Sequence, residues 1–186
     1  MKATGIVRRI DELGRVVIPK EIRRTLRIRE GDPLEIFTDR DGEIILKKYS
    51  PIGEMSDFAQ EFVLALHQTF GLQAVICDKD AIIAAAGASK KEWMDKAISA
   101  DVEHCIKNRQ ASLYSLQDSN TVSLVKQGEN GERILNLYVS PVSVLGDGIG
   151  AVILVGKNDG EAIESAAMRA ADMVAAFLSK LMEQTA

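Results

Sequence analysis

The pattern of apolar and polar residues in the first fifty positions predicts four short strands and one short helix. We expect the strands at residues 4–10, 15–18, 34–38 and 43–47. Pro19 suits the start of a helix through residues 20–27, because its missing N–H costs nothing there. The Asp41-Gly42 pair predicts a hairpin turn between the last two strands.

The remaining residues predict an α/β domain. A helix is expected at 54–70, stopped by Gly71, and Ser89-Lys90-Lys91-Glu92 has the form of a capping box for a helix near Trp93. The other expected elements are strands at 73–78 and 81–86, a helix at 99–108, a hairpin of 122–126 with 133–140, a strand at 149–156 and a helix at 160–182. This order implies an antiparallel sheet with helices on its faces.

The C-terminal helix carries apolar residues at alternating steps of four and three: Ile163, Ala167, Ala170, Val174, Phe177 and Leu181. Such a seam is too short for a free coiled coil. Two interpretations are open, because the helix could cover its own sheet or pack against the same helix of a partner chain. The helix is longer than so small a sheet requires, and we therefore favour a bundle shared between subunits.

A breaker at Ser50-Pro51-Ile52-Gly53 predicts two domains. We expect a first domain at 1–50, a linker at 51–55 and a second domain at 56–186. A fifty-residue piece with short strands has little core and exposed edges. Pairing with a second copy, with hairpins exchanged, solves both problems, so the sequence predicts a dimer of N-terminal domains.

Charge is concentrated at the N-terminus. Residues 2–29 hold nine Lys/Arg against three acids, whereas the whole chain has a net charge of −4. Arginine suits phosphates and guanine edges because its planar fork makes paired hydrogen bonds. A solvated face balanced by later acids is the alternative, but crowding of like charges is destabilising unless it is used. We therefore expect binding of double-stranded DNA through Arg8, Arg9, Arg15, Arg23 and Arg24.

The stretch TGIVRRIDELGRVVIPKEIRRTLRI, followed by GDPLEIF and DGEIILKKY, resembles the N-terminal domain of the AbrB-type transition-state regulators of spore-forming bacteria. The resemblance implies a mainly β, swapped-hairpin barrel formed by a dimer that binds DNA. It also implies that Arg8, Arg15, Arg23 and Arg24 match the family's DNA-contacting positions, with Arg9 matching a basic position less firmly. The predicted helix is too short to read many base edges, which favours recognition of DNA shape.

The C-terminal part resembles a GAF domain, a small α/β ligand-sensing module, and one branch of the AbrB family carries such a domain. The resemblance implies a pocket for a small-molecule ligand between sheet and helices. The cyclic-nucleotide signature of some GAF domains is absent from the sequence, so cyclic nucleotides are not favoured.

Candidate chemistry is sparse. His67 and His104 have no metal-binding spacing, Asp78 and Asp80 have the pattern of turn residues, and residues 150–157 fail the phosphate-loop pattern. Trp93 is more often core than pocket lining in such a setting. We expect no catalytic residues, no metal and no cofactor, and therefore no enzyme.

The sequence thus predicts a cytoplasmic, nucleoid-associated transcriptional regulator of sporulation-type developmental genes, with activation and repression both open. Two cysteines without paired spacing favour a reducing compartment, and we expect neither a secretion signal nor a membrane span. The C-terminal helices favour a tetramer over a doubly joined dimer. The alternative function is an antitoxin-like interaction module, since antitoxins share the small N-terminal barrel.

Overall fold

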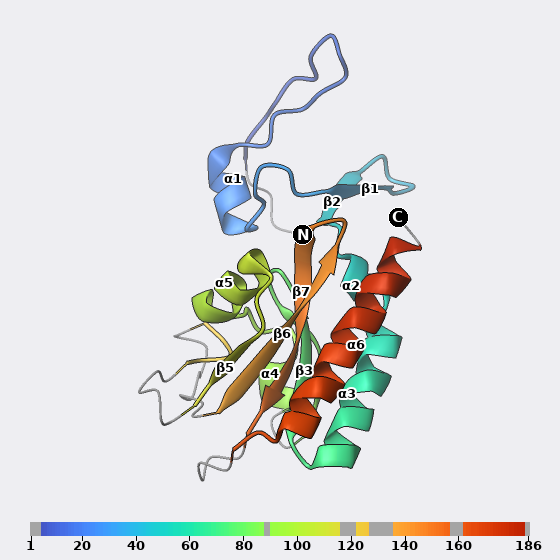
Figure 1. Ribbon diagram of the computed structural model, residues 1–186. Coiled ribbons are helices and arrows are strands. Elements are labelled where there is room, and N and C mark those ends of the chain that lie inside the picture. The colour runs from blue at the N-terminus through green and yellow to red at the C-terminus, as the bar shows by residue number, and fades with distance from the viewer. Residues whose placement is uncertain (1–4, 88–89, 116–121, 127–135, 157–161, 185–186) are drawn as a thin grey trace. The chain divides into compact units, whose positions relative to one another are not determined.

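The computed structural model describes residues 5–87, 90–115, 122–126, 136–156 and 162–184. The chain divides into two compact units, Met1–Tyr49 and Ser50–Ala186 (Figure 1).

The first unit contains one short helix and one hairpin. Helix α1 spans Lys20–Thr25, and strands β1 (Leu34–Thr38) and β2 (Ile44–Lys48) pair antiparallel. Gly42 turns the hairpin with a φ of 80°, a left-handed conformation that glycine adopts without strain. The predicted hairpin is therefore confirmed.

The two strands expected at 4–10 and 15–18 are not formed. Within the described residues, 5–10 and 15–18 have no regular secondary structure. They are joined by a turn in which the Asp11 N–H donates to the Arg15 carbonyl at 3.0 Å. A strand needs a neighbouring strand to accept its hydrogen bonds, and no other described strand of this chain pairs with these residues.

Apolar side chains of the first unit face solvent. Among its described residues Pro19 alone is buried. The exposed large apolar residues of this unit are Ile6, Val7, Ile10, Leu13, Val16, Val17, Leu26, Ile36, Phe37, Ile44, Leu46 and Tyr49. One copy of the unit therefore lacks a core of its own.

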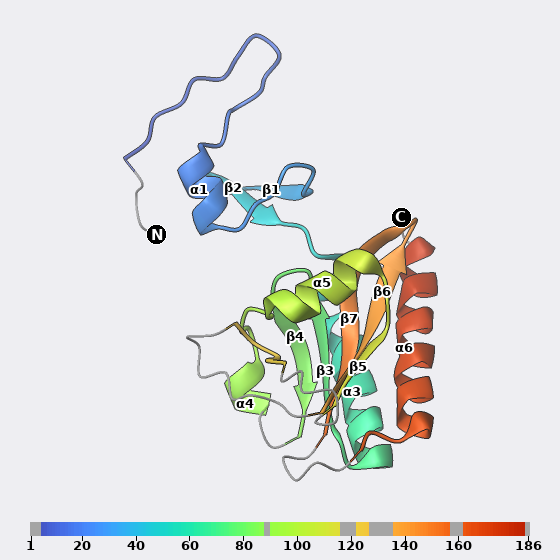
Figure 2. The same cartoon turned by 60° about the vertical axis from the view of Figure 1, so that its left-hand side comes forward.

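The second unit is a five-stranded antiparallel sheet flanked by helices on both faces (Figure 2). The strand order is β4-β3-β7-β6-β5. The strands are β3 (Gln73–Asp78), β4 (Ile82–Ala86), β5 (Ser112–Tyr114), β6 (Leu137–Val144) and β7 (Asp147–Val155). The helices are α2 (Pro51–Glu54), α3 (Ser56–Phe70), α4 (Lys90–Trp93), α5 (Ala100–Asn108) and α6 (Ser165–Glu183). The predicted α/β class with an antiparallel sheet and a long terminal helix is confirmed.

Strand pairing near β6 differs from the expected hairpin of 122–126 with 133–140. Among the described residues, 122–126 contact residues 97–99 through a bridge of Val125 to Ile98 and through backbone hydrogen bonds, and β6 pairs with β7 and with the unpredicted β5. The expected turn at 128–131, the capping residue Ser89 and the helix start at 160 lie outside the described residues.

Residues 51–55, which we expected to be a linker, belong to the second unit. Ser50 caps α2 by accepting a hydrogen bond from the Gly53 N–H at 3.1 Å, and Pro51 occupies the helix start. Ile52 is fully buried in the core of this unit. The proline and glycine that suggested a linker are thus a helix start and a tolerated helical residue.

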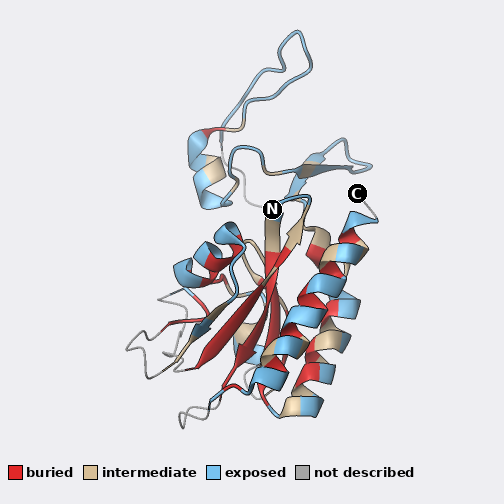
Figure 3. Ribbon diagram, in the orientation of Figure 1, coloured by how far each residue is buried: buried red, intermediate tan, exposed pale blue. Residues whose placement is uncertain are grey.

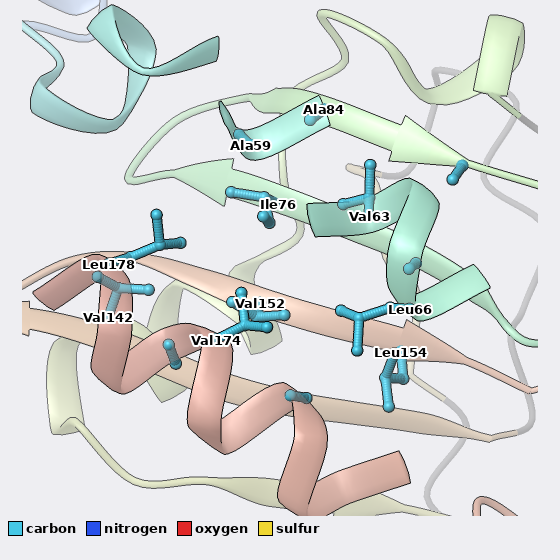
Figure 4. Close-up of a cluster of buried hydrophobic side chains, with 14 of the residues drawn as sticks. Ala59, Val63, Leu66, Ile76, Ala84, Val142, Val152, Leu154, Val174 and Leu178 are labelled. Atoms are coloured by element: carbon cyan, nitrogen blue, oxygen red, sulfur yellow. The ribbon is translucent and has the colours of Figure 1, made fainter. Parts of the chain in front are cut away.

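Two apolar layers cover the sheet, one on each face (Figure 3). On one face, Val63 and Leu66 of α3 and Val174 and Leu178 of α6 meet strand residues such as Ile76 (Figure 4). On the other face α5 packs with Ile98, Val122, Leu124 and Val125. Alternation along β3 supplies both layers, since Ala74 and Ile76 face one way and Val75 and Cys77 the other.

The seam predicted for the C-terminal helix matches the buried stripe only in part, with Ile163, Ala167 and Val174 buried. The buried residues of the helix are Ala167, Ala171, Val174, Ala175, Leu178 and Met182. Ala167 and Val174 face the core as expected, whereas Phe177 remains 50% exposed. The sheet takes the stripe next to the seam because a helix on a flat sheet buries a broad face, not a narrow heptad line.

Candidate nucleic-acid interface

The five predicted DNA-binding arginines lie on three segments of the first unit. Arg8 and Arg9 are in the arm before the Asp11 turn, Arg15 follows that turn, and Arg23 and Arg24 are in the last turn of α1. Four of them are exposed, and Arg23 is partly buried. The chain therefore presents these guanidinium groups to solvent from separate local structures.

The turn at residues 11–15 fixes Arg15. The Asp11 Oδ1 atom accepts hydrogen bonds from the backbone N–H groups of Leu13 (3.0 Å) and Arg15 (2.8 Å). The Oδ2 atom pairs with Arg15 Nε at 2.7 Å. These hydrogen bonds, from the Arg15 backbone first and its side chain second, hold the pKa of Asp11 below its usual value. Asp11 is therefore ionised at neutral pH.

A second polar cluster joins the segment after α1 to the hairpin. Lys48 Nζ donates to the Arg27 carbonyl at 3.1 Å and pairs with Asp32 Oδ2 at 3.0 Å. The same Asp32 oxygen accepts the Arg29 N–H at 2.8 Å. We name Lys48, Asp32 and the Arg27 carbonyl the hairpin clamp, because they tie the chain leaving α1 to β2.

Electrostatics in the clamp favours an ionised Asp32. Burial raises the pKa of this carboxyl, but hydrogen bonds from the Arg29 N–H and from Lys48 outweigh it, so that the pKa lies below its usual value. Arg27 has a φ of 54°, which bends the chain after α1 and ends the helix before the expected residue 27.

Sequence reasoning missed the roles of Asp11, Asp32 and Lys48. It did not pair Asp11 with Arg15, although an acid four residues before an arginine was a usable signal. Lys48 and Asp32 lie 16 residues apart, and they meet because β2 runs antiparallel to β1 and ends near the segment before β1.

Large apolar side chains are also exposed on α3 and α6, two helices that lie side by side in both views (Figures 1 and 2). Phe58, Met173 and Phe177 are 60%, 68% and 50% exposed. Phe62 contacts Phe177, with ring centroids 5.4 Å apart. We call these four residues the α3–α6 face.

The opposite face of the sheet carries an apolar layer with two buried thiols. Burial raises the pKa of Cys77, and Cys105 lies 3.1 Å from the Tyr114 hydroxyl. Burial and that hydrogen bond raise the pKa of Tyr114 to about 12. Trp93 packs partly buried against this layer, which favours a core role.

Other candidate groups are occupied by local contacts. Asp78 Oδ1 accepts hydrogen bonds from the N–H groups of Asp80 and Ala81, as expected of a turn residue. His67 Nδ1 lies 2.7 Å from the Leu72 carbonyl. In the described part of the chain no three His, Cys, Asp or Glu residues gather as metal ligands, and none of its helices has the length and hydropathy of a membrane span.

Comparison with known proteins gives a match along the whole chain. The family model of the stage V sporulation protein T C-terminal, transcription factor, matches residues 54–183. Stage V sporulation protein T of Bacillus subtilis is 53% identical over 186 residues, covering 99% of this chain and all of that protein.

The N-terminal unit has additional relatives. Transition state regulatory protein AbrB of Bacillus subtilis is 64% identical over 63 residues, which cover 31% of this chain and 65% of that protein. The model of the antidote-toxin recognition MazE bacterial antitoxin matches residues 7–54. The resemblance to AbrB-type regulators is thereby confirmed.

The fold of the second unit is that of a GAF domain, as predicted. The PixJ GAF domain of Thermosynechococcus elongatus superposes with a TM-score of 0.53 at 12% identity, covering 74% of this chain and 90% of that chain. The phycocyanobilin-bound GAF domain of a cyanobacterial phytochrome gives the same TM-score at 11% identity, covering 70% of this chain and 85% of that chain. Together with the full-length match, these findings show that the chain belongs to the stage V sporulation protein T family, a family of transcription factors and not of enzymes.

Proposed function

We propose that this protein regulates sporulation-type developmental genes by binding double-stranded DNA through its first unit. The observation that carries the proposal is the set of arginines on the solvent-facing segments of that unit, in a stretch with nine cations and three acids. The 64% identity to AbrB over the N-terminal region supports it. The proposed contacts are Arg8, Arg9, Arg15, Arg23 and Arg24.

The binding unit is a dimer in this proposal. Twelve large apolar residues of the first unit are exposed in one copy, and residues 5–10 and 15–18 have strand-like composition without a strand partner. A second copy that exchanges hairpins would cover the apolar residues and supply the missing ladder. The two sets of arginines would then form one basic surface with two-fold symmetry.

The surface would bind DNA mainly through phosphates and DNA shape. Helix α1 has six residues, which is too short to place many side chains along a groove. The three arginine-bearing segments instead suit contacts distributed along the backbone, with specificity from groove width and deformability.

The second unit would assemble dimers into a tetramer and respond to a small ligand. Phe58, Met173 and Phe177 of the α3–α6 face are apolar and exposed, which fits a bundle with the same helices of another copy. The GAF fold supports a small-molecule ligand at the face that carries α5. A cytoplasmic location at the nucleoid follows from binding to chromosomal DNA.

A salt titration tests the DNA-binding proposal. If about six phosphates are neutralised per dimer, a plot of log affinity against log salt concentration should have a slope of roughly −5. Fluorescence anisotropy with a labelled A·T-rich duplex measures it. A slope near zero would show that the cationic stretch does not contact phosphates.

An antitoxin-like interaction module is the second candidate, favoured by the MazE match at residues 7–54. A folded GAF domain occupies the rest of this chain, where such an antitoxin would carry an extended toxin-binding tail. Limited proteolysis separates the two, since a stable fragment beginning near residue 50 supports the regulator and complete digestion of the C-terminal part supports the antitoxin.

A further inference from the structure

We infer that Asp11 is a positioning residue that aims the guanidinium group of Arg15 and thereby increases discrimination between DNA sequences. The inference rests on the proposed DNA-binding function and goes beyond it, because Asp11 would contribute by restraining a contact and not by making one.

The Asp11 carboxylate is fixed independently of the Arg15 side chain. Two backbone N–H groups, of Leu13 and Arg15, hold its Oδ1 atom at 3.0 and 2.8 Å. The turn is closed by hydrogen bonds from the Asp11 N–H to Arg15 and from the Gly14 N–H to Asp11, each 3.0 Å long. Gly14 has a φ of 76°, which the turn requires and glycine permits. The second carboxylate oxygen is therefore a fixed acceptor on the edge of the turn.

Arg15 meets this acceptor through one nitrogen. Its Nε lies 2.7 Å from Asp11 Oδ2, whereas its side chain is 70% exposed. Among the described residues its terminal Nη groups make no hydrogen bond with other side chains. Because the guanidinium is planar and rigid, holding Nε fixes the plane in which those remaining donors point. Arg15 thus presents an oriented fork to solvent, where a freely rotating side chain would sample many directions.

Stability does not explain this pair. An exposed ion pair contributes little to folding, and an acid on a DNA-binding surface repels phosphates. Specificity is a difference between the affinities for two DNA sequences. The Asp11 carboxylate would increase that difference because it weakens binding to any phosphate and restrains the guanidinium group of Arg15. Asp11 is ionised at neutral pH, as an aspartate ordinarily is, and the hydrogen bonds from Arg15 lower its pKa further, so the repelling charge is present.

The chain offers a matched control one residue away. Glu12 lies in the same turn, is exposed and has no hydrogen bond or ion pair among the described residues. Asp11→Asn keeps an oxygen that can accept the two backbone N–H groups but removes the ionic partner of Nε. Glu12→Gln removes the same charge from the same turn without touching Arg15.

The test uses full-length protein and measures affinity for two duplexes of equal length and base composition, one enriched from a random pool by the wild type and one scrambled. Both variants should bind the scrambled duplex a few-fold more tightly than the wild type, because each removes a negative charge. Asp11→Asn should also lose on the order of tenfold in the ratio of enriched to scrambled affinity, the cost of a misdirected arginine contact. Glu12→Gln should leave that ratio unchanged.

Arg15→Lys gives a second, independent reading that leaves the Asp11 turn intact. An ammonium group has no fork to orient, so Arg15→Lys should reduce the ratio of enriched to scrambled affinity by a similar factor. Adding Asp11→Asn to Arg15→Lys should reduce that ratio no further. Any of three results would overturn the inference. The affinity ratio could be unchanged in Asp11→Asn, it could fall equally in Asp11→Asn and Glu12→Gln, or the reductions from Asp11→Asn and Arg15→Lys could add. If the wild type binds neither duplex, the proposed function fails first; if it discriminates and Asp11→Asn discriminates equally, only this inference fails.

Discussion

Adjacent arginines of α1 differ in how the fold holds them. Arg24 is exposed, whereas Arg23 is partly buried and its backbone carbonyl accepts the Ile28 N–H at 2.8 Å. The side chain of Arg24 is therefore available for DNA at no structural cost, and that of Arg23 also packs against the unit.

We predict that Arg24→Ala weakens DNA binding by about 1–3 kcal/mol and leaves the free energy of unfolding unchanged within about 0.5 kcal/mol. Anisotropy titration and urea unfolding measure the two quantities. Lys20→Ala, another exposed cation of α1, serves as the comparison and should weaken binding less. Loss of folding in Arg24→Ala would mean that this arginine is structural.

At this scale the sequence revealed the cations but not their partners. Nine cations in 28 residues stand out against an acidic chain without any knowledge of the fold. The pairing of Asp11 with Arg15 needs the left-handed Gly14, and the pairing of Asp32 with Lys48 needs the completed hairpin. Side-chain contacts of this kind depend on backbone geometry that residue type does not specify.

Between elements, the hairpin clamp joins the chain leaving α1 to strand β2, and thus sets where Arg23 and Arg24 lie relative to the hairpin. Its central carboxylate has a pKa below the usual value. A group with a lowered folded-state pKa stabilises the fold above its unfolded-state pKa, and this contribution is lost as the pH falls through the folded-state value.

Asp32→Asn should therefore destabilise the first unit by about 1–2 kcal/mol at pH 7, and the difference from the wild type should shrink below about pH 4. Thermal unfolding of residues 1–49, followed through their amide signals in the full chain, measures it. Glu30→Gln removes an exposed acid nearby and should be neutral at every pH. A difference that persists at low pH would assign the effect to packing and not to charge.

Elements with a local cause were predictable, and elements with a distant cause were not. The β1–β2 hairpin follows from Asp41-Gly42 and its flanking alternation, and α3 ends at Gly71, as expected, with a φ of 68°. Residues 4–10 and 15–18 were predicted as strands because their composition favours a strand, but a strand also needs a partner to accept its hydrogen bonds. The predicted seam included Phe177, which is exposed. A heptad seam repeats every 3.5 residues and a straight helix every 3.6, and the apolar pattern of one short helix does not distinguish these two periods.

On the scale of the whole molecule, the α3–α6 face is the feature that bears on assembly. If the proposed tetramer forms through this face, Phe177→Lys should convert it into dimers and leave the melting temperature of the second unit nearly unchanged, because half of the side chain is already exposed. Light scattering measures the mass. Ala176→Lys, at the preceding and also exposed position of α6, is the matched control and should keep the mass of the wild type. Equal masses for both variants and the wild type would exclude this face.

The exposed apolar residues of the first unit have a consequence for protein turnover. A newly made chain displays twelve large apolar side chains over its first 49 residues, eight of them outside the β1–β2 ladder, and exposed apolar segments are what chaperones and proteases recognise. If a second copy covers them, survival of a chain depends on meeting another before degradation. The half-life of the protein would then lengthen as its synthesis rate rises, so that the abundance of this regulator responds more than proportionally to expression of its gene.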